Sequence, residues 1–310
     1  MPICGRFAPS TTGDAHPGTL LAGLLCWLDL RRQGGRAILR LEDLDPERCS
    51  PAKTTALWEQ LRWFGLDDWD VVERQSRHSS RHHRALHQLS EAGLLYACSC
   101  TRSQLRQHAR RREDGSLIYP GTCRDRRISR LEDAMAIPPL RCYLEGSYEL
   151  GDESVGRLAG DLSRDCGDPI VLRRDGGVAY QLASVVDDAA QGVNRIVRGR
   201  DLWLSTPIQS ALAERLGLAL PSYRHHLLLL QAEGDKLSKF HAAVGVPELA
   251  RHYQPTALCG WLAWVAGLQS DPAPCRPADL IPDFTWSRVR SSDQIVAWNG
   301  SQLQHLGAVA

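Results

Sequence analysis

The fold is decided by the N-terminal stretch Ile3-Cys4-Gly5-Arg6-Phe7-Ala8-Pro9-Ser10-Thr11-Thr12-Gly13-Asp14-Ala15-His16-Pro17-Gly18-Thr19. A short apolar run over residues 3–8 leads through a loop into an amphipathic run from Thr19 to Gln33, which Gly34-Gly35 closes. This order predicts a strand, a loop and a helix. In an open parallel sheet such a loop borders the ligand crevice, and the free N–H groups of the helix N-terminus suit phosphate.

The segments that follow repeat the same alternation. Residues 36–41 are a second strand candidate that ends at Glu42-Asp43, and Ser50-Pro51 opens a helix through Phe64. Alternating strands and helices predict an α/β fold with a parallel sheet. Farther along, Asp175-Gly176-Gly177 predicts a hairpin turn between strands at 170–173 and 178–182.

Composition bounds the class of protein. Charged residues are 24% and hydrophobic residues 43% of the 310, and no apolar run approaches the roughly 20 residues of a membrane helix. No secretory signal is readable at the N-terminus, so we expect a cytoplasmic protein without a membrane partner. The net charge of +1 excludes a general polycation, and the ten cysteines are expected to be reduced thiols or metal ligands.

Two segments offer groups that suit phosphate. His16 and Gly18 lie in the first loop, and Lys236-Leu237-Ser238-Lys239 holds two of the only three lysines in the chain. An imidazole can donate to a phosphate oxygen, and two ammonium groups can neutralise a triphosphate. Each segment alone is more often a plain surface turn. Together, in this order, they predict a nucleotide site.

The same segments carry a resemblance to the class I aminoacyl-tRNA synthetases of the glutamyl type. The matching motifs are Arg6-Phe7-Ala8-Pro9-Ser10, His16-Pro17-Gly18-Thr19, Glu42-Asp43-Leu44-Asp45-Pro46, Tyr180-Gln181-Leu182-Ala183-Ser184, Ile196-Val197-Arg198-Gly199 and Lys236-Leu237-Ser238-Lys239-Phe240. The resemblance implies a Rossmann-type catalytic domain over residues 1–243, with a zinc-binding insertion around 98–123. Pro-punctuated residues 244–310 are expected to form a small helical stem-contact-like domain, without an anticodon-binding domain.

The resemblance also assigns roles to residues. Arg6 and Arg198 would hold a substrate carboxylate, Glu42 would accept from the α-ammonium of glutamate, and Tyr180 and Ser10 would supply hydroxyl groups. The full glutamate set is Arg6, Phe7, Ala8, Pro9, Ser10, Glu42, Tyr180 and Arg198, and the catalytic and ATP-binding set is His16, Gly18, Lys236 and Lys239. Surface ion pairs for the arginines and ordinary packing for the tyrosine are the alternatives. Thr12, Pro17 and Phe240 depart from the usual family pattern.

Cys98, Cys100 and Cys123 form a candidate metal site. Three thiolates could bind zinc if the fold brings both ends of the segment together, with His108 or water as fourth ligand. The resemblance supplies Tyr119 instead, since short relatives have Cys-x-Cys followed by Tyr-x-x-x-Cys. We expect one structural zinc per chain; the alternative is three buried thiols.

Residues 102–130 concentrate positive charge. They hold nine arginines against Glu113, Asp114 and Asp125, a surplus of +6. Such a segment beside a nucleotide site predicts contact with an RNA backbone, and a solvated charged helix is the alternative.

The expected reaction has two steps and no covalent enzyme intermediate. Glutamate attacks the α-phosphorus of ATP, with Mg²⁺ on the phosphates, and an RNA hydroxyl then takes the glutamyl group. Only 70 residues follow Phe240, which is short for an anticodon-reading region. Short relatives of this kind glutamylate queuosine at the wobble position of tRNA(Asp), which is therefore the expected partner of a monomeric enzyme.

Other functions remain open at this point. A truncated glutamyl-tRNA synthetase would charge the terminal adenosine of a tRNA. The chain could also be a catalytically inactive zinc-dependent RNA-binding paralogue, or an adenylyltransferase acting on a small molecule.

Overall fold

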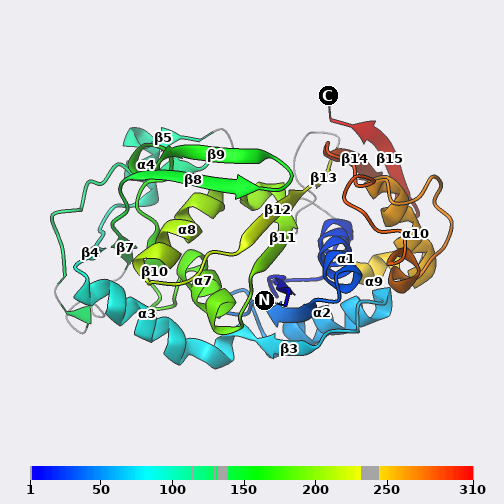
Figure 1. Cartoon of the computed structure of the whole chain (residues 1–310), viewed down its shortest axis with the longest axis horizontal. Coiled ribbons are helices and arrows are strands. Elements are labelled where there is room, and N and C mark those ends of the chain that lie inside the picture. The colour runs from blue at the N-terminus through cyan, green and yellow to red at the C-terminus, as the bar shows by residue number, and fades with distance from the viewer. Residues whose placement is uncertain (1, 113–114, 129, 132–138, 232–243, 310) are drawn as a thin grey trace. The chain divides into compact units, whose positions relative to one another are not determined.

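A computed structural model describes residues 2–112, 115–128, 130–131, 139–231 and 244–309 (Figure 1). The chain divides into two compact units. The first unit comprises Met1–Ser76, Arg195–Asp201 and Tyr223–Ala310, and the second comprises Arg77–Asn194 and Leu202–Ser222. Within the described ranges, every helix is too short or too polar to span a lipid bilayer.

The first unit is organised around a sheet with the strand order β3-β2-β1-β11-β12. Its strands are β1 (Cys4–Phe7), β2 (Arg36–Leu41), β3 (Val71–Arg74), β11 (Arg195–Gly199) and β12 (Ser222–His226). β1 pairs in parallel with both β2 and β11, and β2 pairs in parallel with β3. The predicted α/β fold with a parallel sheet is therefore confirmed.

The helices between these strands lie where they are predicted, although the first begins two residues before the expected Thr19. Pro17 is the first residue of α1 (Pro17–Arg32), a position at which proline loses no hydrogen bond. α2 (Pro51–Phe64) matches its predicted bounds, and the Ser50 side chain caps it by accepting from the amide of Lys53. The strand predicted at residues 36–41 is confirmed in full.

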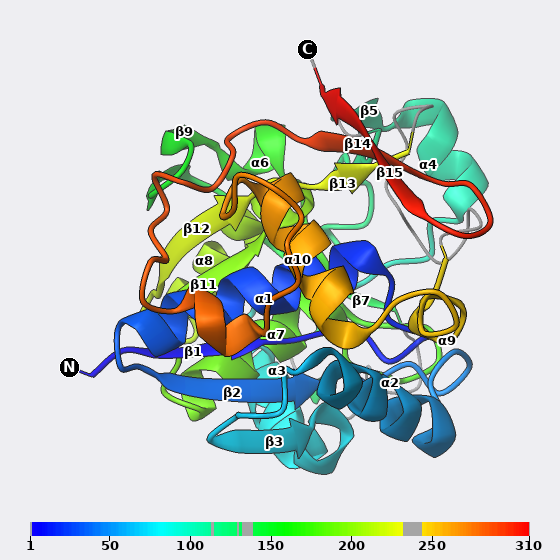
Figure 2. The ribbon, with the colours of Figure 1, turned by 90° about the vertical axis from the view of Figure 1, so that its right-hand side faces the viewer.

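One face of this sheet is apolar. Side chains alternate between the two faces along a strand, and Phe7, Ala37, Leu39, Leu41 and Val197 belong to one buried hydrophobic cluster. α1, α2 and α10 (Pro255–Ala266) complete that cluster, and α10 lies over α1 in Figure 2. The other face carries Arg6, Arg40, Glu42 and Arg198, which are thus brought together by strand alternation.

A buried ion pair connects α1 to the sheet. Asp29 accepts from Arg195 Nε at 2.5 Å and Nη2 at 2.9 Å, and also from Trp286 Nε1 at 2.6 Å. The bidentate contact joins α1 to β11, and the bond from Trp286 adds the C-terminal region of the chain.

The C-terminal region is mixed rather than wholly helical. It contains α9 (Val246–Leu249), α10, the 3₁₀ helix η3 (Pro277–Leu280), and the strands β14 (Gln294–Trp298) and β15 (Leu303–Ala308). β14 pairs with β13 (Leu229–Leu230) in parallel and with β15 in antiparallel fashion. The predicted boundary near residue 243 falls outside the described residues, and the flanking residues on both sides belong to the first unit.

The second unit combines helices with short sheets. Its main elements are α3 (Ser79–Glu91), β4 (Leu95–Ala97), α4 (Arg102–His108), β5 (Arg110–Arg111), β6 (Leu117–Ile118), β7 (Leu140–Cys142), β8 (Ser147–Asp152), β9 (Gly156–Asp161), α6 (Leu162–Asp165), β10 (Ile170–Leu172), α7 (Tyr180–Ala190) and α8 (Thr206–Arg215). One three-stranded sheet has the order β10-β7-β4, and β8 and β9 form a hairpin. The strand predicted over residues 178–182 is wrong, because only Val178 bridges to Leu172 before α7 begins.

Candidate functional site

The carboxyl ends of β1 and β2 bring two of the predicted residues together. Ser10 and Glu42 form a parallel bridge just beyond the two strands. The amide of Glu42 donates to Pro9 O, and the amide of Thr11 donates to Glu42 O, both at 3.0 Å. The strand pairing therefore continues past the strand ends and fixes the backbone on which both side chains stand.

The carboxylate of Glu42 lies beside a buried cation. Arg40 Nη2 is 3.3 Å from Glu42 Oε1, and the Arg40 side chain is 0% exposed while that of Glu42 is 10% exposed. Because residues 40 and 42 lie two apart on the same strand path, both side chains point to the same face. The guanidinium thus orients the Glu42 carboxylate.

Arg6 and Arg198 share that face. The register pairs Gly5 with Arg195, so Arg198 falls beside Ala8, two residues beyond Arg6 on β1. Both arginines are buried. Two buried guanidinium groups on one face form a strongly attractive environment for a carboxylate.

Arg198 is held by β12. Its Nε donates to His225 Nε2 at 3.0 Å, and its guanidinium carbon lies 5.4 Å from the centre of the Tyr223 ring. The Tyr223 and His225 rings are parallel, with centroids 6.3 Å apart. As acceptor, His225 must be neutral and carry its proton on Nδ1.

His16 and Gly18 form the start of α1. His16 is the N-cap residue, with φ −117° and ψ 170°, and its carbonyl accepts from the amide of Leu20 at 3.0 Å. A Cβ on Gly18 would lie 3.1 Å and 3.2 Å from His16 Cε1 and Nδ1, tighter than ordinary packing. The glycine therefore makes room for the imidazole above the first turn of the helix.

The other predicted residues have different placements. Phe7 is buried in the core and stacks on Trp69 at 6.2 Å, so only its backbone could meet a substrate. Tyr180 is the first residue of α7 in the second unit. Lys236, Lys239 and Phe240 lie outside the described residues.

Two site residues were missed by sequence reasoning. Arg40 could have been found from its spacing of two from Glu42 in a predicted strand, which places both on one face. His225 had no such signal, because its contact with Arg198 depends on the order of β11 and β12 in the sheet.

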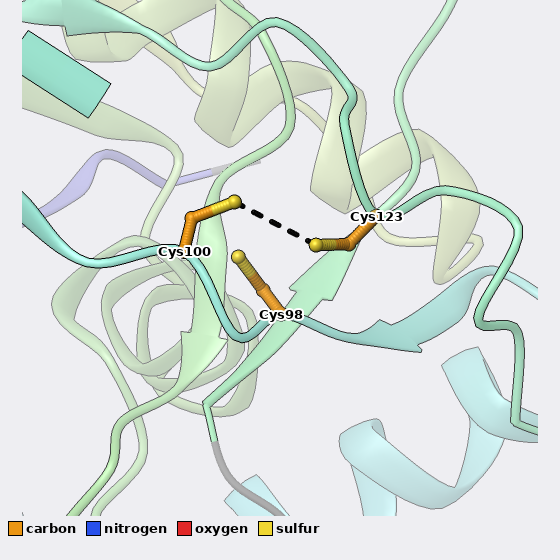
Figure 3. Close-up of side chains that lie close together, drawn as sticks. All are labelled: Cys98, Cys100 and Cys123. Atoms are coloured by element: carbon orange, nitrogen blue, oxygen red, sulfur yellow. Dashed lines mark hydrogen bonds between the residues drawn. The ribbon is translucent and has the colours of Figure 1, made fainter. Parts of the chain in front are cut away.

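In the second unit, three cysteines converge (Figure 3). The sulfur atoms of Cys98, Cys100 and Cys123 all lie within 4.8 Å of one another, and those of Cys100 and Cys123 are 3.6 Å apart. The Tyr119 hydroxyl is 3.6 Å from Cys98 Sγ and 3.8 Å from Cys100 Sγ. Tetrahedral zinc, with bonds of about 2.3 Å to sulfur and about 2.0 Å to oxygen, holds its ligand atoms about 3.5–3.8 Å from one another. These four groups therefore fit a metal ion.

Ionisation at this cluster differs between its members. Burial opposes the Cys123 thiolate, but hydrogen bonds from the Tyr119 hydroxyl and from Ser99 and Cys100 outweigh it and lower the pKa of Cys123 from 9.0 to about 7. Burial raises the pKa of Cys100 and that of Tyr119. A bound cation would favour the charged form of each group.

Tyr119 is held firmly in place. The guanidinium carbon of Arg141 lies 3.7 Å from its ring centre, and its hydroxyl accepts from the amide of Cys123 at 2.9 Å. Gly167 has φ +67°, and a Cβ there would lie 2.7 Å from the backbone nitrogen of Tyr119, so a glycine is needed for this close approach.

The side chain of His108, the alternative fourth ligand, is not part of what the structure describes.

Several of the arginines in residues 102–130 bond to the protein itself. Arg112 donates to Asp165 O at 2.8 Å and to Cys166 O at 2.7 Å, and Arg110 donates to Arg164 O. Arg127 donates to Gly93 O at 2.6 Å. Part of this charge concentration therefore stabilises carbonyl groups of the second unit.

The fold is that of a class I aminoacyl-tRNA synthetase. Residues 2–258 match the family described as tRNA synthetases class I (E and Q), catalytic domain, and the chain belongs to this family of ligases. Among solved structures, the glutamate-tRNA synthetase of Elizabethkingia anophelis shares the fold with a TM-score of 0.75 at 22% identity, covering 97% of this chain and 69% of that one.

Curated relatives are similar over nearly their whole length. The chain is 41% identical to the glutamyl-Q tRNA(Asp) synthetase of Nitratidesulfovibrio vulgaris, over 90% of this chain and 91% of the relative. It is 39% identical to the glutamyl-Q tRNA(Asp) synthetase of Symbiobacterium thermophilum, over 93% and 94% of the two chains.

Proposed function

We propose that the chain activates L-glutamate with ATP and transfers the glutamyl group to queuosine at the wobble position of tRNA(Asp). The observation that carries this proposal is the similarity, at about 40% identity and over nine tenths of both chains, to proteins named glutamyl-Q tRNA(Asp) synthetase. The buried Arg6 and Arg198, with Glu42 on the same face of the sheet, support the proposal. Because ATP and tRNA are its substrates, we propose the cytoplasm as its place of action.

Glutamate would bind to the polar face of the sheet. Arg6 and Arg198 would hold a carboxylate, and Glu42 would accept from the α-ammonium group. Ser10, bridged to Glu42, would add a hydroxyl contact, and the backbone of Phe7, Ala8 and Pro9 would border the substrate. The family motif assigns Tyr180 a hydroxyl contact with the substrate, and we keep this role in the proposal.

ATP would bind at the start of α1. His16 and the backbone around Gly18 would donate to the phosphates, helped by the positive end of the helix dipole. Lys236 and Lys239 would neutralise the phosphates, and Mg²⁺ would supply further positive charge there. Val246 donates its amide to Ala15 O at 2.8 Å, so the chain seven residues after Lys239 lies beside the residue that precedes His16.

Both proposed steps are substitutions. A glutamate α-carboxylate oxygen attacks the α-phosphorus, the bond to the β-phosphate oxygen breaks, and pyrophosphate leaves. A hydroxyl oxygen of queuosine then attacks the acyl carbon, the bond from that carbon to the phosphate oxygen breaks, and AMP leaves while the hydroxyl proton passes to its phosphate. Charge neutralisation and positioning by the residues above supply the catalysis.

The metal would have a structural role. Cys98, Cys100, Cys123 and Tyr119 would hold one zinc, which would join the chain just after β4 to the residues around Cys123. The alternative of three buried thiols predicts a protein without zinc.

RNA binding would use the exposed arginines of the second unit. Arg102 and Arg106 are exposed on α4, whereas Arg112 is committed to backbone carbonyls. Charge reversal at Arg102 and Arg106 is therefore a cleaner test of RNA contact than reversal at Arg112, which would also disturb the fold.

The test is incubation with labelled glutamate, ATP and tRNA(Asp), with or without queuosine. Label on the queuosine-containing tRNA alone is expected, and equal label on both tRNAs would contradict the assignment. Periodate distinguishes a truncated glutamyl-tRNA synthetase, because glutamate on the terminal ribose protects that diol from oxidation. Absence of glutamate-dependent exchange of pyrophosphate into ATP would favour an inactive paralogue.

A further inference from the structure

Gln60 connects α2 to the loop that carries His16. It is 9% exposed. Its Nε2 donates to Asp14 Oδ1 at 2.6 Å, and its Oε1 accepts from the amide of Ala15 at 2.7 Å. One side-chain amide thus uses both its donor and its acceptor on two consecutive residues of the loop.

The same loop is bonded from a second direction. The carbonyl of Ala15 accepts from the amide of Val246, at the start of α9. Gly245 packs closely here, because a Cβ on it would lie 3.0 Å from Asp14 Cβ. Both backbone polar groups of Ala15 are therefore bonded to segments far away in the sequence.

These bonds fix the residue that comes immediately before His16. Ala15 is 0% exposed, so its amide has no access to water and depends on Gln60 for a partner. The next carbonyl, that of His16, already belongs to the first turn of α1. The position of the imidazole relative to the sheet is thus determined by the Gln60 amide on one side and the helix on the other.

We propose that Gln60 is a positioning residue that holds the His16 loop in the conformation that binds the ATP phosphates. This inference rests on the proposed function. Gln60 contacts no substrate: it acts through Asp14 and Ala15, because donors that must meet a developing charge need to be held in place before the reaction.

The donor and acceptor pattern allows a swap. In Gln60→Glu the carboxylate still accepts from Ala15 but cannot donate to Asp14, and two carboxylates face each other. Adding Asp14→Asn restores the pair, because the new amide donates to the new carboxylate. Gln60→Met removes both bonds at similar size, and Glu59→Met, exposed on the same helix, is the matched control.

The readouts are the KM for ATP and the KM for glutamate in pyrophosphate exchange, and the dissociation constant for ATP measured by titration. All variants are compared at a temperature at which circular dichroism shows them folded. We expect Gln60→Met and Gln60→Glu to raise the KM and dissociation constant for ATP at least about tenfold, a loss of about 1.4 kcal/mol, with the KM for glutamate changed less than about twofold. Glu59→Met should match the wild type.

The double variant shows whether Gln60 positions the His16 loop or only stabilises the fold. Recovery of ATP affinity to within about threefold of the wild type in Asp14→Asn/Gln60→Glu supports the proposal. Failure of the double variant to improve on Gln60→Glu overturns it, as do equal changes in both KM values. If Gln60→Met does not fold, the Gln60→Glu pair still gives the answer.

The proposed function and the role of Gln60 can be refuted independently. A wild-type chain that binds ATP but gives no glutamate-dependent exchange refutes the proposed function, and the ATP affinities of the variants still decide the role of Gln60. A wild-type chain that does not bind ATP overturns both.

Discussion

Removal of the Asp29 charge should destabilise the first unit strongly. The Asp29 side chain is 2% exposed and that of Arg195 is 10% exposed, and the carboxylate accepts three hydrogen bonds, two of them from the guanidinium. Asp29→Asn takes the charge of this carboxylate away from a buried guanidinium. Losing one partner of such a pair costs about 3–5 kcal/mol. We therefore expect the free energy of unfolding to fall by this amount.

Urea unfolding followed by tryptophan fluorescence measures this effect. Arg31→Met, on the same helix, is the control: its partners Asp68 and Asp70 are 71% and 44% exposed, so at most about 1 kcal/mol should be lost. The double variant Asp29→Leu/Arg195→Met should be more stable than either single variant, because it removes both charges of the pair together. A loss below about 1 kcal/mol in Asp29→Asn, or additive effects in the double variant, would refute this reasoning.

Three further outcomes follow from the structure. Burial lowers the pKa of His226 from 6.5 to about 4. Between these two pH values only the unfolded chain takes up the proton, which favours unfolding. The free energy of unfolding should therefore keep its full value above pH 6.5 and fall by about 2 kcal/mol by pH 5. His226→Gln should flatten that slope in urea titrations at several pH values, and an unchanged slope would contradict the assignment. His225→Leu should raise the KM for glutamate at least about tenfold and leave that for ATP unchanged, with partial rescue by His225→Gln, whose amide oxygen can still accept from Arg198; equal effects on both KM values would speak against it. Purified protein should contain one zinc per chain, and Tyr119→Phe should weaken zinc binding about tenfold or more in competition with a chelator, because water would replace the phenol; a metal-free wild type prepared without chelator would rule the site out.

Local sequence patterns were sufficient to predict strands and helices of the first unit. The strand at residues 36–41 and the helix at 51–64 follow from hydrophobic alternation and from a serine cap with a proline in the first turn. The segment around Tyr180 was misassigned for a physical reason. Val178 to Leu182 is a short apolar run, which fits a strand as well as a buried helix, and only the longer buried face of α7 decides between them.

The candidate site was predictable only in part. Ser10 and Glu42 lie just after two adjacent parallel strands, so their meeting follows from the pairing of those strands. Gln60 and His225 could not be found, because their contacts join segments whose proximity is a property of the folded chain. The thiol cluster was predictable by residue type, whereas its geometry required the fold of the second unit.

The pairing of β13 with β14 has a practical consequence for anyone trimming the chain. A version that stops at residue 243 would leave the short strand β13 without its parallel neighbour and strip α10 from the apolar face of α1. It would also remove the amide of Val246 from Ala15. Residues 244–309 thus stabilise the fold of the first unit, and a fragment without them should be insoluble rather than merely less active.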